Sequence, residues 1–168
     1  MTTKKLTVVN IGGFGHSLEV LGQVAEAECL NLAALAPGYQ QEDCTIYKSS
    51  PACPEDVKIF DDYHQLLDGV KPDIAIISTR LDLIPTIAID AAKAGCHLIL
   101  EKPLALDEKT LKQLYKAVKE NGVKLMAMLS MRAIPHYMAA KEVYDSGVIG
   151  EAVLINGRQS YKWSTRPD

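Results

Sequence analysis

Glu101, Lys102 and Pro103 are the residues of this chain most able to do chemistry. They follow the mostly apolar run 97–100, which has the composition of a buried strand, and the proline ends that strand at once. A carboxylate and an ammonium therefore stand at the carboxyl end of a strand, where open α/β sheets bind their ligands. A lysine in that position can accept or donate a proton when its surroundings lower its pKa. The tripeptide alone is equally typical of an ordinary exposed strand end.

A glycine-rich segment between the first predicted strand and the first predicted helix is the second candidate. It reads Gly12, Gly13, Phe14, Gly15 and His16. Glycines let backbone N–H groups approach a pyrophosphate, and the N-terminus of the following helix favours its negative charge. The match to G-x-G-x-x-G is imperfect, because Leu18 stands at the third glycine when the pattern begins at Gly13. A glycine turn without a ligand remains the alternative.

Ser78 and Thr79 end the fourth predicted strand, where their hydroxyls could face a nicotinamide or a ribose. Hydroxyl residues at such positions are also common caps. The second strand of a dinucleotide-binding fold usually ends in an acidic residue that holds the NAD ribose. Here that strand ends at residues 35–37, Leu-Ala-Pro, with neither an acid nor a nearby arginine for a 2′-phosphate. The sequence therefore leaves the choice between NAD and NADP open.

Other chemistries find no support in the sequence. The four histidines are dispersed, so no metal site is predicted. There is no G-x-S-x-G elbow, no Cys-His signature and no glycine turn followed by Lys-Ser/Thr. The four cysteines form no C-x-x-C pair and are predicted to be reduced thiols, although two of them share one loop; they are Cys29, Cys44, Cys53 and Cys96.

The bulk composition is that of a globular protein. The chain has 168 residues, 48% hydrophobic and 23% charged, enough for one ordinary domain or one domain plus a fragment. Its net charge of -3 shows no basic excess that would favour nucleic acid or an anionic membrane surface. Small neutral or anionic molecules remain possible ligands. No apolar run reaches the ~20 residues of a membrane helix, and no signal-peptide core is present, so we predict a cytoplasmic protein.

Strands and helices alternate along most of the chain. The predicted strands are residues 6–11, 30–36, 57–60, 73–78, 97–100 and 124–129. The predicted helices are one capped by Ser17, a short one over 61–67, and others beginning near Pro85, Asp107 and Ile134. Residues 39–54 form a long irregular stretch of the kind that often has a function. This rhythm predicts an α/β fold, a doubly wound, Rossmann-like parallel sheet.

The pattern changes after Gly150. Residues 152–157 are predicted to be one more strand, and the residues that follow are polar. We therefore expect residues 1–150 to form a dinucleotide-binding domain and residues 151–168 to begin a truncated C-terminal α+β substrate domain.

Together these features resemble the Gfo/Idh/MocA family, which includes glucose-fructose oxidoreductase and inositol dehydrogenase. The resemblance is carried by the glycine turn, residues 73–79 and 94–105, Arg132 and Pro135, and residues 146–151. It implies that NAD or NADP binds to the first half of the protein, and that hydride moves between a sugar or polyol carbon and the nicotinamide. A second half with an open sheet would supply the substrate pocket, and complete members would be homo-oligomers.

The resemblance also implies roles for single residues. Lys102 would take part in acid/base catalysis at the substrate hydroxyl, and Glu101 would help to fix the lysine or the cofactor. Pro103 would shape the turn beside the nicotinamide through a cis bond, and Arg132 would contact the cofactor. Pro85 departs from the family, which often has a histidine near this position, and the family's catalytic aspartate and histidine would lie beyond residue 168. The rival interpretation is a non-catalytic binding or assembly module with a degenerate fold.

Overall fold

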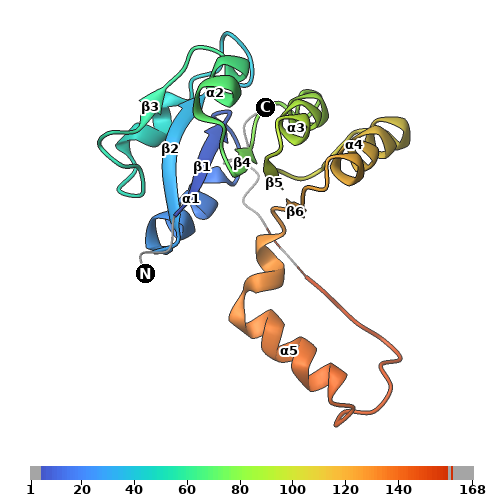
Figure 1. The fold of residues 1–168 in the computed structure, drawn as a ribbon. Coiled ribbons are helices and arrows are strands. Elements are labelled where there is room, and N and C mark those ends of the chain that lie inside the picture. The colour runs from blue at the N-terminus through green and yellow to red at the C-terminus, as the bar shows by residue number, and fades with distance from the viewer. Residues whose placement is uncertain (1–4, 159, 161–168) are drawn as a thin grey trace. The chain divides into compact units, whose positions relative to one another are not determined.

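The structure is a computed structural model in which residues 5–158 and 160 are described. The chain divides into two compact units, Met1–Met128 and Leu129–Asp168. The described residues of the first unit contain the sheet, four α-helices and a 3-10 helix (Figure 1). The second contains a 3-10 helix and one α-helix. The division into domains at residue 150 stays a prediction.

Six parallel strands form one sheet in the first unit, in the order β3-β2-β1-β4-β5-β6. They are β1 (Leu6–Ile11), β2 (Leu30–Ala36), β3 (Lys58–Ile59), β4 (Ile74–Ile77), β5 (His97–Leu100) and β6 (Leu125–Ala127). The strand order reverses between β1 and β4, and ligands of open α/β sheets bind outside the carboxyl ends at such a point. The predicted doubly wound parallel fold is confirmed.

The helices of the first unit are α1 (Ser17–Glu26), α2 (Tyr63–Val70), α3 (Ile84–Lys93) and α4 (Glu108–Glu120). Asp107 caps α4 as predicted, because its carboxylate accepts the N–H of Thr110 at 2.8 Å. The predicted cap of α1 is wrong. His16 holds the N-cap position, while Ser17 is the first helical residue and is fully buried. The turn at Gly15, with φ +77°, brings Ser17 into the core before it can cap the helix.

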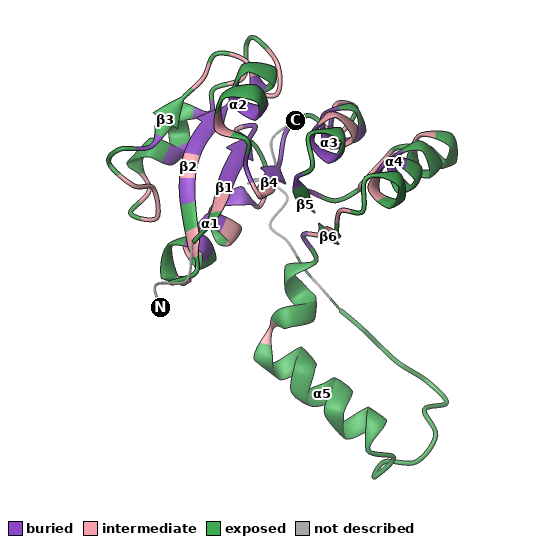
Figure 2. Ribbon diagram, viewed as in Figure 1, coloured by how far each residue is buried: buried purple, intermediate pink, exposed green. Residues whose placement is uncertain are grey.

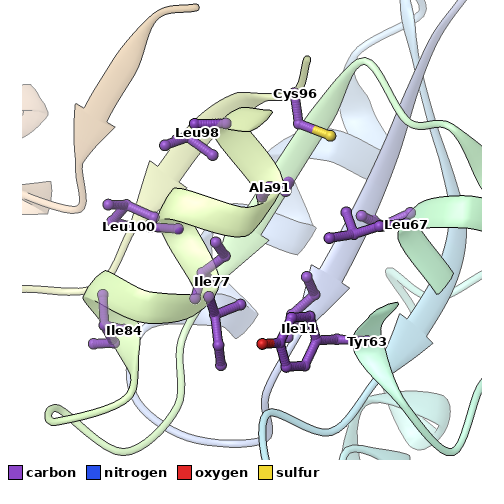
Figure 3. Close-up of a cluster of buried hydrophobic side chains, with 14 of the residues drawn as sticks. Ile11, Tyr63, Leu67, Ile77, Ile84, Ala91, Cys96, Leu98 and Leu100 are labelled. Atoms are coloured by element: carbon purple, nitrogen blue, oxygen red, sulfur yellow. The ribbon is translucent and has the colours of Figure 1, made fainter. Parts of the chain in front are cut away.

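Apolar side chains cover both faces of the sheet. On one face, residues of α2, α3 and α4 pack on alternate side chains of the strands. Figure 3 shows Tyr63 of α2 beside Ile11 of β1 in this cluster, while Leu98 of β5 lies farther away, near Ala91 of α3 and Cys96. On the other face, α1 and the 3-10 helix η1 (Thr45–Ser49) cover Val8, Leu35 and Ile76. The central strands are accordingly buried along most of their length (Figure 2). This double cover makes the sheet a rigid base for the residues at its edge.

The second unit contains η2 (Ser130–Ala133) and α5 (Pro135–Asp145), which confirms the last predicted helix. The strand predicted over residues 152–157 is wrong, since the described residues of this segment form no strand. A strand needs a neighbour for its backbone hydrogen bonds, and no described strand pairs with this one. Residues 161–168, which we expected to belong to the start of a second domain, lie outside the described part of the chain. None of the described helices is both long enough and apolar enough to cross a bilayer.

Candidate functional site

Four neighbouring strands end side by side at the carboxyl edge of the sheet. Ile11 of β1 is in register with Ala36 of β2 and with Ile77 of β4, which in turn pairs with Leu100 of β5. The residues that follow these strand ends are therefore neighbours in space, although they are far apart in sequence. They are Gly12, Pro37, Ser78 and Glu101. The fold thus brings the predicted glycine turn, the Ser78-Thr79 pair and Glu101 to one edge.

The glycine turn is folded tightly against this edge. Gly12 has φ +105°, and a Cβ added there would lie 2.1 Å from the carbonyl oxygen of Ser78. A Cβ on Gly15 would lie 2.3 Å from Oε2 of Glu101. The N–H of Phe14 donates to the Ser78 carbonyl at 3.2 Å, and the Ser78 hydroxyl donates to the Phe14 carbonyl. Side chains at these two glycines would push the turn away from β4 and from Glu101, so the turn itself needs glycine.

Glu101 joins the glycine turn to β5. Its side chain is only 3% exposed, and its carboxylate accepts the backbone N–H groups of His16 at 2.7 Å and of Lys102 at 2.9 Å. Nδ1 of His16 lies 2.9 Å from Oε2, and the Ser78 hydroxyl oxygen, whose hydrogen is donated to the Phe14 carbonyl, lies 3.3 Å from the same oxygen. Sequence reasoning assigned Glu101 to the lysine or the cofactor. The structure shows that it holds the turn as well as the lysine backbone.

Burial raises the pKa of the Glu101 carboxyl, but the hydrogen bonds from His16 and Lys102 outweigh it and hold the pKa below its usual 4.5. A carboxyl with a lowered pKa stabilises the fold above its unfolded pKa, and this contribution is lost as the pH falls through its folded pKa. We therefore expect the unfolding free energy to fall on acidification below 4.5, more steeply for the natural chain than for Glu101→Gln.

At neutral pH the Glu101→Gln change should cost about 1.5–3 kcal/mol, the usual worth of hydrogen bonds to a charged group. Urea unfolding at a series of pH values measures both effects. The exposed Glu55 provides the matched control, since Glu55→Gln removes a carboxylate from the surface. If the unfolding free energies of Glu101→Gln and of the natural chain decreased by the same amount as the pH is lowered, this role of the carboxylate would be contradicted.

Lys102 and Pro103 continue directly from this anchored carboxylate. Both residues are exposed, and the peptide bond between them is cis, as the resemblance implied. The backbone of Lys102 is fixed by its N–H bond to Oε1 of Glu101. Its ammonium makes no ion pair within the described residues and is free to meet a ligand. Lys102 therefore has a backbone held in place by Glu101 and a side chain that is exposed to solvent.

Two buried polar atoms near the turn lack partners. Ser17 Oγ, at the N-terminus of α1, and Oδ1 of Asn10, near the end of β1, have no hydrogen-bond partner among the described residues. Both residues are fully buried. Unsatisfied polar atoms are costly and usually mark a missing partner. The positive end of the α1 dipole favours an anionic group such as a pyrophosphate, whereas the Asn10 oxygen can only accept a hydrogen bond and needs a donor instead.

Sequence reasoning missed Glu42, which lies in the irregular segment after β2. Its Oε2 accepts the N–H of Gly38 at 2.7 Å, and both of its oxygens accept the hydroxyl of Thr79, at 2.9 and 2.8 Å. The end of β2 itself has no acidic residue, but the loop that follows bends back and places the Glu42 carboxylate beside Gly38, two residues past the strand. The only local signal would have been an acid a few residues after Pro37-Gly38, and that pattern occurs in many loops.

Arg132 is the one predicted site residue outside the first unit. It is exposed on η2, and its N–H donates to the carbonyl of Leu129 at 2.9 Å. The structure brings the other predicted residues together at the sheet edge. Cofactor contact by Arg132 stays a prediction.

Comparisons with known proteins show what this chain is similar to. The sequence profile of the Gfo/Idh/MocA oxidoreductases, described as having an NAD-binding Rossmann fold, matches residues 7–129. Inositol 2-dehydrogenase of Salmonella typhimurium is 27% identical over 99% of this chain and 48% of that protein. Levoglucosan dehydrogenase of Pseudarthrobacter phenanthrenivorans is 34% identical over 64% of this chain and 27% of that protein.

Solved structures show the same fold. The crystal structure of myo-inositol 2-dehydrogenase from Lactobacillus plantarum superposes with a TM-score of 0.74, at 22% identity, over 88% of this chain and 43% of that one. The chain spans about half the length of the inositol dehydrogenases that it matches, 48% for the Salmonella protein.

Proposed function

The chain belongs to the Gfo/Idh/MocA family of oxidoreductases with an NAD-binding Rossmann fold, and from this premise we propose that it forms the cofactor-binding part of a dehydrogenase for a small polyol or sugar. Its relatives include inositol and levoglucosan dehydrogenases. The observation that carries the proposal is the junction at Glu101, whose buried carboxylate anchors the glycine turn while the exposed Lys102 continues from it.

The residues present fit a dinucleotide. In this proposal the glycine turn and the N-terminus of α1 bind the pyrophosphate. In the same proposal Ser78, Thr79 and Pro103 lie along the nicotinamide half of the cofactor, and Arg132 is a further cofactor-binding residue. When bound, the nicotinamide supplies the hydride acceptor, which no side chain can provide.

Lys102 is the proposed acid/base group. Its backbone is held by Glu101, so the side chain leaves the sheet edge from a fixed point. In its neutral form Nζ accepts the proton of a substrate hydroxyl, and as an ammonium it returns that proton in the reverse reaction. Residues 1–150 would be the cofactor domain, and residues 151–168 the start of a substrate domain. A cytoplasmic location and homo-oligomeric assembly belong to the same proposal.

A titration of the purified chain with NAD+, NADH, NADP+ and NADPH tests this function, with the melting temperature as the readout. A dinucleotide at about 100 times its Kd should stabilise the fold by roughly 2.7 kcal/mol. Sodium sulfate at equal ionic strength controls for salt effects. The absence of a shift with all four dinucleotides at millimolar concentration would favour the rival, a non-catalytic module that kept only the fold.

A further inference from the structure

We propose that Glu42 holds the adenosine ribose of the cofactor and makes this chain prefer NAD(H) to NADP(H). The inference rests on the proposed function, because it concerns one end of the same dinucleotide site. It assigns to a loop residue the task that a strand-end acid usually performs.

The segment after β2 bends back so that the Glu42 carboxylate lies at the end of that strand. The N–H of Glu42 donates to the carbonyl of Tyr39 at 3.0 Å, which closes a turn. The carboxylate then accepts the N–H of Gly38, two residues past β2, and the hydroxyl of Thr79, two residues past β4. On its other side the loop abuts the glycine turn, where a Cβ on Gly13 would lie 2.1 Å from the carbonyl oxygen of Asp43. Glu42 thus stands beside the ends of both strands that flank β1.

The carboxylate has capacity left for a ribose. An ionised carboxylate offers about four acceptor positions on its two oxygens. The N–H of Gly38 and the single hydroxyl hydrogen of Thr79 account for two hydrogen bonds. The remaining positions suit the 2′- and 3′-hydroxyls of an NAD ribose, which are both donors. A 2′-phosphate would instead bring negative charge and lone pairs against a carboxylate, which is unfavourable.

Arg80 offsets this charge only in part. Arg80 follows β4 and lies over the Tyr39 ring, 5.2 Å from its centroid. Its guanidinium is engaged by Asp82, with Nε–Oδ1 at 2.9 Å and Nη2–Oδ2 at 2.6 Å. Asp82 thus engages two of the guanidinium nitrogens and reduces the positive charge that a 2′-phosphate would meet, while both side chains remain exposed.

The space next to Glu42 is acidic as well. A cavity of about 460 Å³ adjoins it. Four carboxylates line this cavity and none of its lining residues in the described chain is Lys or Arg; the acids are Glu42, Asp43, Asp61 and Asp62. The field there disfavours a phosphate, in agreement with the hydrogen-bond count at Glu42.

Isothermal titration calorimetry with NAD+ and NADP+ tests the inference. The natural chain should bind NAD+ at least about tenfold more tightly than NADP+. This is the effect on Kd of one hydrogen bond between the ribose and the charged carboxylate, or of the repulsion between that carboxylate and a 2′-phosphate. Glu42→Gln keeps the size of the side chain and should weaken NAD+ binding about tenfold, while NADP+, which no longer faces the carboxylate charge, should bind at least as tightly as before. The control Asp61→Asn removes one charge from the same cavity, but Asp61 makes no hydrogen bond to Gly38 or Thr79, so the control should change the ratio of the two Kd values much less than Glu42→Gln does.

A measurement on the natural chain alone avoids any folding defect of the variant. Adenosine 5′-monophosphate should compete with NAD+ better than adenosine 2′,5′-bisphosphate, since only the first presents a free 2′-hydroxyl. Equal competition, a preference for NADP+, or a ratio that Glu42→Gln leaves unchanged would overturn the role of Glu42 and leave the proposed function standing. Failure of the natural chain to bind either dinucleotide would overturn the proposed function, and this inference with it.

Discussion

Replacing Lys102 by alanine should lower kcat by about 10²- to 10⁴-fold in an active protein that contains this chain, the usual contribution of a general acid or base. The dinucleotide Kd should stay within about twofold of the natural value, because exposed surface substitutions rarely change stability or binding by more than about 0.5 kcal/mol. The backbone of Lys102 is held by Glu101, so the variant loses the amine without releasing the turn. Steady-state kinetics together with a cofactor titration separates the two effects.

Two further variants sharpen this test. Lys102→Arg keeps the positive charge but cannot lose its proton at ordinary pH, so it should be nearly as inactive as the alanine variant. Lys124 is equally exposed but precedes β6, at the opposite edge of the sheet, and Lys124→Ala should leave turnover unchanged. Full activity in Lys102→Arg would show that the lysine acts by charge alone, and full activity in Lys102→Ala would remove it from the chemistry.

Gly12→Ala should destabilise the fold by about 3–5 kcal/mol, the combined cost of a strained backbone and an overpacked contact. Gly12 has φ +105°, a conformation that alanine rarely adopts. Its new Cβ would also lie 2.1 Å from the carbonyl oxygen of Ser78 and 2.9 Å from Cβ of Thr79. The first of these neighbours is backbone and cannot rotate away, so the turn must move off β4. A domain of ordinary stability would lose a large fraction of its free energy of unfolding.

Gly22 provides the matched control for this substitution. It lies within α1, and a Cβ added there would meet no atom within 4 Å. Gly22→Ala should therefore stabilise the chain by about 0.5–1 kcal/mol through helix propensity. Urea unfolding of both variants gives the comparison. Similar midpoints for Gly12→Ala and the natural chain would show that the turn is not held against β4 as described.

The periodicity of the sequence was sufficient to predict the sheet. Strands and helices that bury whole faces leave a repeating apolar pattern, and residues 6–11, 30–36 and 97–100 were predicted with the bounds that the structure shows. The strand expected over residues 152–157 had the same apolar texture and did not form. The residue types of a segment indicate a preference for the extended conformation. Whether the segment joins a sheet depends on a neighbouring strand, which its own residues do not determine.

The candidate site was predictable only where its chemistry is local. The glycine turn and the Lys102-Pro103 pair are contiguous motifs, and they could be found by reading along the chain. The bonds between Glu101 and His16 join residues 85 apart, so nothing near either residue indicates them. Glu42 reaches Thr79 through a loop without periodicity, so nothing in the sequence near either residue indicates this contact. Both contacts arise because the fold brings the ends of separate strands together, and the residue types alone do not indicate them.

Hydrogen–deuterium exchange of the chain with and without NAD+ tests most directly that the cofactor lies over the carboxyl edge of the sheet. Bound NAD+ should slow exchange in peptides covering residues 11–18, 36–44 and 77–81, which carry the glycine turn, the Glu42 loop and the end of β4. Peptides at the opposite edge, such as residues 93–97, should exchange as before. Saturable binding without protection of the glycine turn, or with protection confined to the opposite edge, would contradict the account.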